Sequence, residues 1–145
     1  MLNEGRIKLA IGLLSFAGLA ISGYLTYVHY YSLHPVCLTG GCETVQSSSY
    51  AVFLGIPVAL IGVIGYVLIP ASLLIRGGWG TLLGVIFSFA GLGYSIYLTY
   101  LELFQIHAIC QWCVTSAALI TLIAILMSIR FLRDEKIQAG GHQPS

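Results

Sequence analysis

Charged residues are scarce in this chain: only 8% of its 145 residues are Asp, Glu, Lys or Arg, against about 25% in ordinary soluble domains. Six basic and five acidic residues leave a net charge of +1, which argues against a nucleic-acid partner. Motifs for nicotinamide, flavin or haem are also missing. Hydrophobic residues make up 58% of the chain, and its mean hydropathy is +0.94. This composition excludes an ordinary soluble domain and indicates a membrane protein.

Four long uncharged stretches each reach the roughly 20 apolar residues that a helix needs to cross a bilayer. The sequence therefore predicts an all-α, polytopic membrane protein built as a four-transmembrane-helix bundle. We expect helices over about 9–28, 52–75, 79–101 and 109–129, with an outer loop over about 29–51. Residues 1–133 would form one catalytic domain and residues 134–145 a cytoplasmic tail.

The basic residues predict how the helices are oriented. They lie before the first helix (Arg6, Lys8), between the second and third (Arg76), and after the fourth (Arg130, Arg133, Lys136). With four spans, these three places lie on one side, which the positive-inside rule makes cytoplasmic. We therefore expect a multi-pass protein of the cell membrane, with both termini cytoplasmic and all four cysteines on the outer side.

The two halves of the chain resemble each other at an offset of 73 residues. Residues 15–27 and 88–100 are identical at ten of thirteen positions, and both end in Tyr-Leu-Thr-Tyr. The same offset aligns His34 with His107 and Cys37 with Cys110. Chance similarity between two small-residue-rich helices is the alternative. We expect a parallel two-helix repeat, in which small-residue pairs such as Gly18 and Ser22 allow close helix contact.

The four cysteines form two pairs. Cys37 and Cys42 could form a structural disulfide that closes a Gly-Gly turn. Cys110 and Cys113 form a Cys-x-x-Cys at a predicted helix start, where the helix dipole lowers the pKa of the first thiol. There we expect redox chemistry, with Cys110 facing the aqueous edge and Cys113 facing the bundle interior. Glu102 is expected to be a solvated charge of the outer face.

Two redox-active pairs on one side of a membrane protein suggest a relay. A soluble dithiol protein would reduce the loop pair, the loop pair would reduce the helix pair, and a membrane quinone would accept the electrons. Two other functions are open. The cysteines and histidines could bind zinc or copper, or the disulfides could merely stabilise a structural bundle.

Two segments of the sequence resemble the vitamin K epoxide reductase family in its bacterial and archaeal form. One is the run from Cys42 through Gly-Ile-Pro57, and the other is Cys110-Gln-Trp-Cys113-Val-Thr. The resemblance covers the membrane core. It implies a quinone-dependent thiol:disulfide oxidoreductase with a four-helix bundle around the quinone, which could be ubiquinone, menaquinone or a related molecule.

The resemblance also implies a role for each cysteine in disulfide bond formation. Cys110 and Cys113 would be the active site, and Cys113 would contact the quinone. Cys42 would form the transient bond with Cys110, while Cys37 would exchange with the outside partner. Many bacterial members carry a fused thioredoxin-like domain that this sequence lacks, so we expect a separate thioredoxin-fold thiol oxidant as the partner.

Four further residues are candidates for the quinone site. Ser48 matches a serine that the family places near the active-site disulfide, and Leu54 and Val58 match positions that line its quinone pocket. The last two are four apart in the predicted second helix and would share one face. His107 lies about one turn before Cys110 if the fourth helix extends back, where a protonated imidazole would lower the thiol pKa. Each could instead be an ordinary loop, packing or interfacial residue.

Two departures from the family concern the substrate. The quinone-bonding asparagine and tyrosine of the animal enzymes correspond here to about Ala51 and to Ala117. Opening an epoxide needs a proton donor aimed at the epoxide oxygen, whereas reducing a quinone depends less on such a positioned donor. The sequence therefore favours oxidation of protein thiols with reduction of a quinone over reduction of vitamin K epoxide, which stays open as the alternative.

Overall fold

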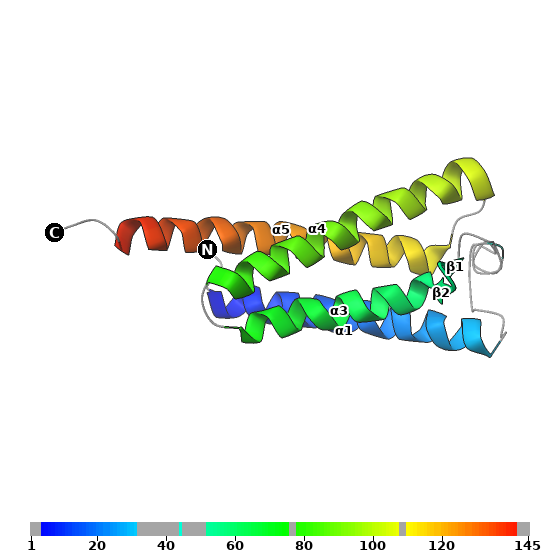
Figure 1. Ribbon diagram of the computed structural model, residues 1–145, viewed down its shortest axis with the longest axis horizontal. Coiled ribbons are helices and arrows are strands. Elements are labelled where there is room, and N and C mark those ends of the chain that lie inside the picture. The colour runs from blue at the N-terminus through cyan, green and yellow to red at the C-terminus, as the bar shows by residue number, and fades with distance from the viewer. Residues whose placement is uncertain (1–3, 32–43, 45–51, 76–77, 108–109, 142–145) are drawn as a thin grey trace.

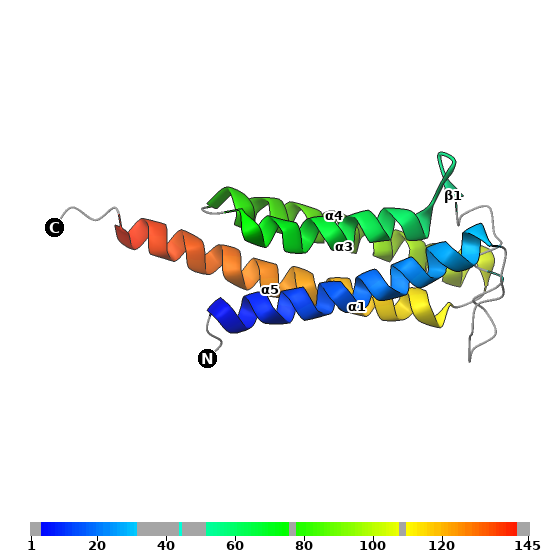
Figure 2. The same ribbon diagram turned by 90° about the horizontal axis from the view of Figure 1, so that it is seen from below.

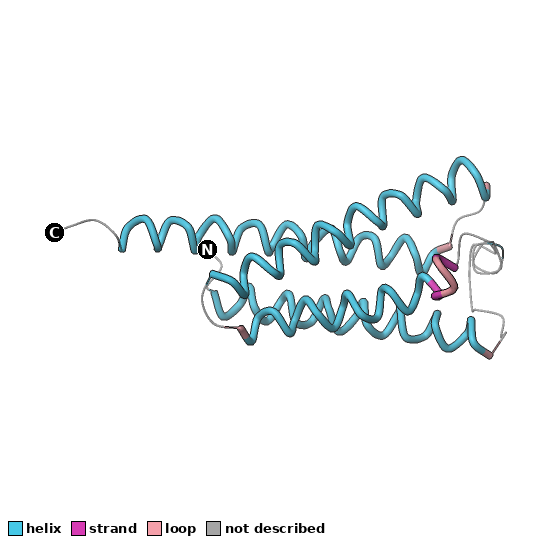
Figure 3. The backbone as a smooth tube through the Cα atoms, viewed as in Figure 1, coloured by secondary structure: helices cyan, strands magenta, loops and turns pink. Residues whose placement is uncertain are grey.

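The computed structural model describes residues 4–31, 44, 52–75, 78–107 and 110–141, and it is almost entirely helical (Figure 3). Its helices are α1 (Glu4–Tyr30), α3 (Val58–Leu74), α4 (Gly78–Leu101), the π-helix η2 (Glu102–Ile106) and α5 (Gln111–Gly141). Strands β1 (Val52–Phe53) and β2 (Ile56–Pro57) form a short antiparallel hairpin. The all-α fold class is therefore confirmed.

Three segments are long and apolar enough to span a membrane: Gly5–Tyr30, Gly78–Ile106 and Gln111–Arg133. Helix α3 is apolar too but has 17 residues, fewer than the roughly 20 needed for a full crossing. These lengths support a membrane protein. Helix α5 also continues to Gly141, well beyond the predicted end at 129 and through most of the predicted tail.

The prediction of a helix over 52–75 is wrong in residues 52–57, which form the hairpin. Val52 pairs with Pro57, and Phe53 pairs with Ile56. The turn residues Leu54 and Gly55 have φ values of 54° and 84°. Positive φ at both central positions is the geometry of the tight turns that join antiparallel strands. Pro57 is the N-cap of α3, with φ −59° and ψ 135°. A proline disfavours helical backbone in the residue before it, so Ile56 stays extended.

The four long helices form a ring in which each helix packs against two others. Helix α1 contacts α3 and α5, and α4 contacts the same two helices. Both described ends of the chain lie at one end of the bundle, and the β1–β2 hairpin lies at the other (Figures 1 and 2). The end that holds the hairpin is called here the hairpin end. It also holds the start of α5, so residues 110–113 lie there.

Small residues bring the helices close together, as predicted. A Cβ atom added at Gly18 of α1 would overlap the Tyr66 ring of α3, and one added at Gly62 would lie 2.8 Å from the Ser22 hydroxyl. A Cβ atom added at Gly91 of α4, 73 positions after Gly18, would lie 3.2 Å from the Ile120 side chain of α5. Gly18 and Gly91 thus each meet the next long helix along the chain, although the internal repeat itself stays a prediction.

The apolar core occupies the half of the bundle nearer the termini. Its buried side chains come from the start of α1, the second half of α3 and the middle of α5: Ile7, Ile11, Tyr66, Ile69, Ile120, Ile123 and Met127. Large aliphatic side chains fill the space between the helices there. The remaining space inside the bundle therefore lies toward the hairpin end, beside the start of α5.

Candidate active site

A cavity of about 500 Å³ lies among the helices and extends toward the hairpin end. This volume falls within the usual range for small-molecule sites, which are mostly apolar with a few placed polar groups. The wall is largely aliphatic and aromatic. Its polar or ionisable side chains are Ser22, Tyr66, Tyr94, Ser95, Glu102, Cys113 and Ser116.

Part of the cavity wall is also the outer surface of the bundle. Ile64 and Leu68 of α3 line the cavity and yet are 52% and 37% exposed, and Ala90 of α4 is likewise a wall residue and exposed. The cavity therefore reaches the outside between α3 and α4. In a membrane, apolar side chains at that position would face lipid.

The structure places Cys113 in the cavity wall and Cys110 behind it. Helix α5 begins at Gln111, and the backbone N–H of Val114 donates to the Cys110 carbonyl at 3.0 Å, so Cys110 lies at the N-terminal end of the helix. Both cysteines are thiols in this structure. Cys110 is 0% exposed, so the prediction that it faces the aqueous edge is wrong. Ile106 and Trp112 pack over it.

Hydrogen bonds from Cys113 and Trp112 lower the pKa of the Cys110 thiol. The largest cause is the hydrogen bond with the Cys113 side chain, and the backbone N–H groups of Cys113 and Trp112 act in the same direction. Burial and the negative charge of Glu102 oppose the shift. The lowered pKa favours the thiolate, which is the attacking species in disulfide exchange. Of the two thiols, Cys110 is therefore the one that the hydrogen bonds favour as a thiolate.

Glu102 is buried against the two cysteines, contrary to the prediction of a solvated charge. Its side chain is 4% exposed, and Oε2 accepts a hydrogen bond from the Cys110 backbone N–H at 3.2 Å. A second hydrogen bond joins its carboxyl to the Cys113 side chain. The residue is the first of η2, which directly follows α4. Short π-helical segments are frequently found at functional sites.

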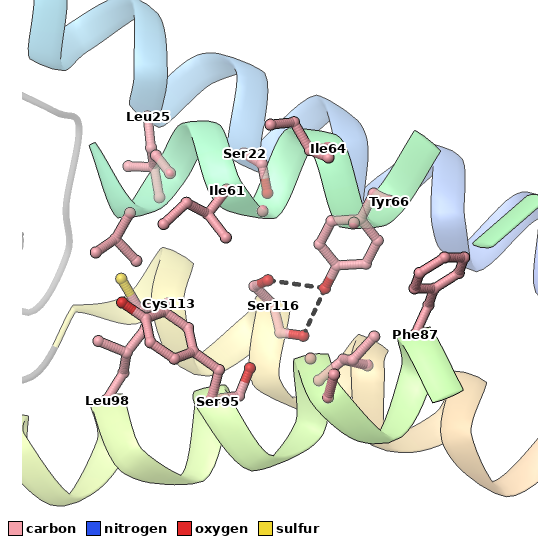
Figure 4. A pocket seen from close by; sticks show the side chains of 18 of the residues that line it. Ser22, Leu25, Ile61, Ile64, Tyr66, Phe87, Ser95, Leu98, Cys113 and Ser116 are labelled. Atoms are coloured by element: carbon pink, nitrogen blue, oxygen red, sulfur yellow. Dashed lines mark hydrogen bonds between the residues drawn. The ribbon is translucent and has the colours of Figure 1, made fainter. Parts of the chain in front are cut away.

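Tyr66 and Ser116 form a polar pair in the cavity wall that the sequence reasoning missed. Tyr66 Oη donates to the Ser116 carbonyl at 2.9 Å and lies 2.8 Å from Ser116 Oγ. Figure 4 shows the pair farther along the cavity than Cys113, on the side toward Phe87. Ser116 is one helical turn after Cys113, and this spacing could have indicated that both side chains lie on the same face of the helix. Its neighbour Ala117 has no hydroxyl to offer.

The other predicted quinone-site residues separate in the structure. Val58 lines the cavity. Leu54 lies in the hairpin turn and is 86% exposed, so the prediction that it shares a helix face with Val58 is wrong. His107 is also exposed and ends η2 with φ 56°, so the fourth helix does not extend back to it. The remaining predicted residues, Cys37, Cys42 and Ser48, lie outside the described part of the chain together with Ala51.

Within the part of the chain that the structure describes, no group of three or more His, Cys, Asp or Glu side chains could hold a metal ion. The described cysteines instead adjoin an apolar cavity. Such surroundings suit an organic ligand better than a cation, which needs several charged or polar ligands.

A comparison with known families agrees with the chemistry of these residues. The family model described as "Vitamin K epoxide reductase family" matches residues 9–128. The match runs from α1 into α5 and includes Cys110, Cys113 and the cavity wall. It covers well over half of the 145 residues.

Proposed function

Because the chain belongs to the vitamin K epoxide reductase family, an oxidoreductase family, we propose that it is a quinone-dependent thiol:disulfide oxidoreductase. Electrons enter from a separate thioredoxin-fold protein and pass through Cys37 and Cys42 to Cys110 and Cys113. A membrane quinone then accepts them. The net reaction supports disulfide bond formation, since two protein thiols become a disulfide and the quinone becomes a hydroquinone.

The observation that carries this proposal is the position of Cys113. Its side chain stands in the wall of the apolar cavity, while the Cys110 thiol beside it is buried and has a lowered pKa. Cys110 can therefore exchange disulfides with a loop cysteine on one side, while Cys113 meets a ligand on the other. A relay that carries electrons from a protein to a small apolar acceptor requires these two separate contacts.

The cavity suits a quinone in size and in chemistry. A quinone supplies an apolar ring with two oxygens that take up two electrons and two protons. The wall of the cavity is mainly apolar, and its hydroxyl pair at Tyr66 and Ser116 stands one helical turn from Cys113. A ring held beside Cys113 would place one oxygen within reach of these hydroxyls. The choice among ubiquinone, menaquinone and related molecules is not fixed by these contacts.

The direction toward quinone reduction rests on the residues that stand at the quinone-bonding positions of the animal enzymes. At the two positions where the animal enzymes bond the quinone, this chain has about Ala51 and Ala117. Epoxide opening needs a donor aimed at the epoxide oxygen. We therefore favour oxidation of protein thiols over vitamin K epoxide reduction.

The proposed location is the cell membrane, with both termini cytoplasmic and the cysteines outside. The described basic side chains support it: Arg6 and Lys8 open α1, and Arg130 and Arg133 lie in the second half of α5. Both places are away from the hairpin end, where Cys110 and Cys113 lie (Figure 1). By the positive-inside rule, the hairpin end faces the outside, where a soluble thioredoxin-fold partner can reach it.

The whole-reaction test uses the purified protein in liposomes that contain a quinone. A reduced thioredoxin-fold protein should be oxidised with one hydroquinone formed per disulfide, and the reaction should stop when the quinone is left out. Equal oxidation without a quinone would contradict the proposal. So would four reduced cysteines with stoichiometric bound metal, measured by thiol titration and metal analysis.

Tyr66→Phe tests whether the hydroxyl pair holds the quinone. Removing the phenol oxygen should raise the KM for a short-chain quinone about tenfold, the effect of losing one hydrogen bond of about 1.4 kcal/mol. Oxidation of the partner's thiols at saturating quinone should change little. Steady-state quinone reduction measures both quantities.

The matched control is Tyr97→Phe, which removes the same atom from a half-exposed tyrosine of α4. Its kinetics should equal those of the parent. If Tyr66→Phe leaves the quinone KM as low as this control does, the pair does not contact the quinone.

A further inference from the structure

Glu102 is a buried carboxyl group at the opposite end of the bundle from the described lysines and arginines. Its side chain is 4% exposed and forms part of the cavity wall at the hairpin end. The described lysines and arginines lie in the first turns of α1 or the second half of α5: Arg6, Lys8, Arg130 and Arg133. Buried carboxyl groups usually pair with a positive charge or with hydrogen-bond donors. Here the contacts are with the cysteine pair.

The carboxyl group contacts both members of that pair. Oε2 accepts the Cys110 backbone N–H at 3.2 Å, and a further hydrogen bond reaches the Cys113 side chain. The first contact fixes the carboxyl group at the N-terminal end of α5. The second joins it to an S–H bond that must break each time the pair is oxidised.

Oxidation of the pair releases two protons. When the Cys110–Cys113 disulfide forms, two S–H bonds break, two electrons leave, and both protons must reach an acceptor. The proton of Cys110 is the more easily lost, because its thiol pKa is lowered. Cys113 faces an apolar wall, where water is a poor acceptor. A carboxyl group in contact with that thiol can take the proton and pass it on.

We propose that Glu102 is a catalytic residue that accepts the Cys113 proton when the disulfide forms and returns it when the disulfide is reduced. The final proton acceptor rests on the proposed function, where the quinone takes up two electrons and two protons. The transfer between Cys113 and Glu102 does not depend on that acceptor. The other titratable side chains in the cavity wall are Tyr66 of α3 and Tyr94 of α4. The described histidines at this end of the bundle are His29 in the last turn of α1, which is not in the cavity wall, and His107 after η2, which is exposed.

A purely structural role for Glu102 predicts something different. The bond to the Cys110 N–H could simply cap the start of α5, as acceptor side chains do at helix N-termini. Glutamine keeps an oxygen that can accept this bond but cannot carry the proton. Glu102→Gln therefore separates the two roles.

The experiment uses quinone-free protein with Cys37→Ser and Cys42→Ser, so that only Cys110 and Cys113 react. A small methylthiolating reagent converts Cys110 to a methyl disulfide. Cys113 then attacks this adduct, which forms the internal disulfide and releases methanethiol with its proton. Acid-quenched mass spectrometry over a pH series measures adduct formation and adduct loss separately.

With Glu102→Gln, adduct loss should slow about 10²-fold, the lower range for a removed general base. Adduct formation should shift to lower pH, because removing the negative charge removes a cause that raises the Cys110 pKa. A purely structural cap, which glutamine maintains, predicts instead that adduct loss keeps the parent rate, and a misfolded variant would slow both steps together. Adduct loss within about twofold of the parent, or equal slowing of both steps, would overturn the proposal.

Glu102→Asp is the second variant, since it keeps a carboxyl group that is one methylene shorter. It should slow adduct loss less than Glu102→Gln, and it carries the test if the glutamine variant does not fold. Adduct loss as slow as in Glu102→Gln, or adduct formation slowed together with it, would contradict a proton-carrying role. A chain that failed to reduce quinones would still give these results, so the two proposals fail independently.

Discussion

Cys113→Ala should lower quinone reduction at least about 10³-fold, the range expected when a reacting nucleophile is removed. Without Cys113, Cys110 can exchange with a loop cysteine but has no partner with which to form the internal disulfide. The measurement is a single turnover: the protein is fully reduced, excess reductant is removed, and hydroquinone is followed after a quinone is added.

The matched control for Cys113→Ala is Thr115→Ala in the same helical turn. The Thr115 side chain is exposed, and its hydroxyl donates to the Gln111 carbonyl within α5. This variant should reduce the quinone at the parent rate. Hydroquinone formed at the parent rate by Cys113→Ala would show that the electrons leave from another group, and the proposed mechanism would be wrong.

Cys42→Ala should lower oxidation of a thioredoxin-fold substrate at least about 10²-fold while the single turnover is preserved. Cys110 is 0% exposed, with Ile106 and Trp112 packed against it, so we do not expect a thiol of a separate folded protein to reach it directly. Delivery therefore depends on the loop pair. Chemically reduced Cys110 and Cys113, in contrast, already adjoin the cavity.

The two assays on Cys42→Ala must give different answers for the relay to hold. If substrate oxidation persists, the partner reaches Cys110 without the loop. If the single turnover is lost as well, Cys42 acts at the quinone step, and the order of the two pairs is wrong. Cys37→Ala gives a parallel test, because its loss should block exchange with the partner and also spare the single turnover.

The sequence predicted most of the helical bundle because each membrane helix corresponds to a long, uncharged, apolar run of residues. The uncharged runs located α1, α4 and the first part of α5 to within a few residues. Hydropathy could not separate the β1–β2 hairpin from α3, since a short apolar segment suits a strand or a helix equally well. Gly55 and Pro57 were the local signs that a turn precedes α3. The extension of α5 to Gly141 was missed because polar residues can continue a helix beyond the apolar run.

The site was predicted where a motif carried it and missed where burial decided it. Cys110 and Cys113 were predicted from the Cys-x-x-Cys spacing, its place at a helix start and the family resemblance, and the structure places Cys113 in the cavity wall. Glu102 was misassigned because its orientation depends on η2, which interrupts the helical periodicity after α4. An acidic residue close to the end of an apolar run was nevertheless a signal, since intramembrane carboxyl groups are commonly functional. Tyr66 was missed for a related reason: a tyrosine in an apolar helix gives no sign of the side it faces.

Because the cavity opens between α3 and α4, the rate at which an electron acceptor reaches the site should depend on its concentration in the lipid phase. Ile64 and Leu68 belong to both the cavity wall and the outer surface, so a ligand that enters there arrives from the lipid phase. Its supply is then set by its mole fraction in the bilayer, and its aqueous concentration matters only through partitioning. Quinones with longer tails would gain from this route even where the cavity holds only their rings. Diluting the protein with additional lipid at constant total quinone should therefore slow turnover.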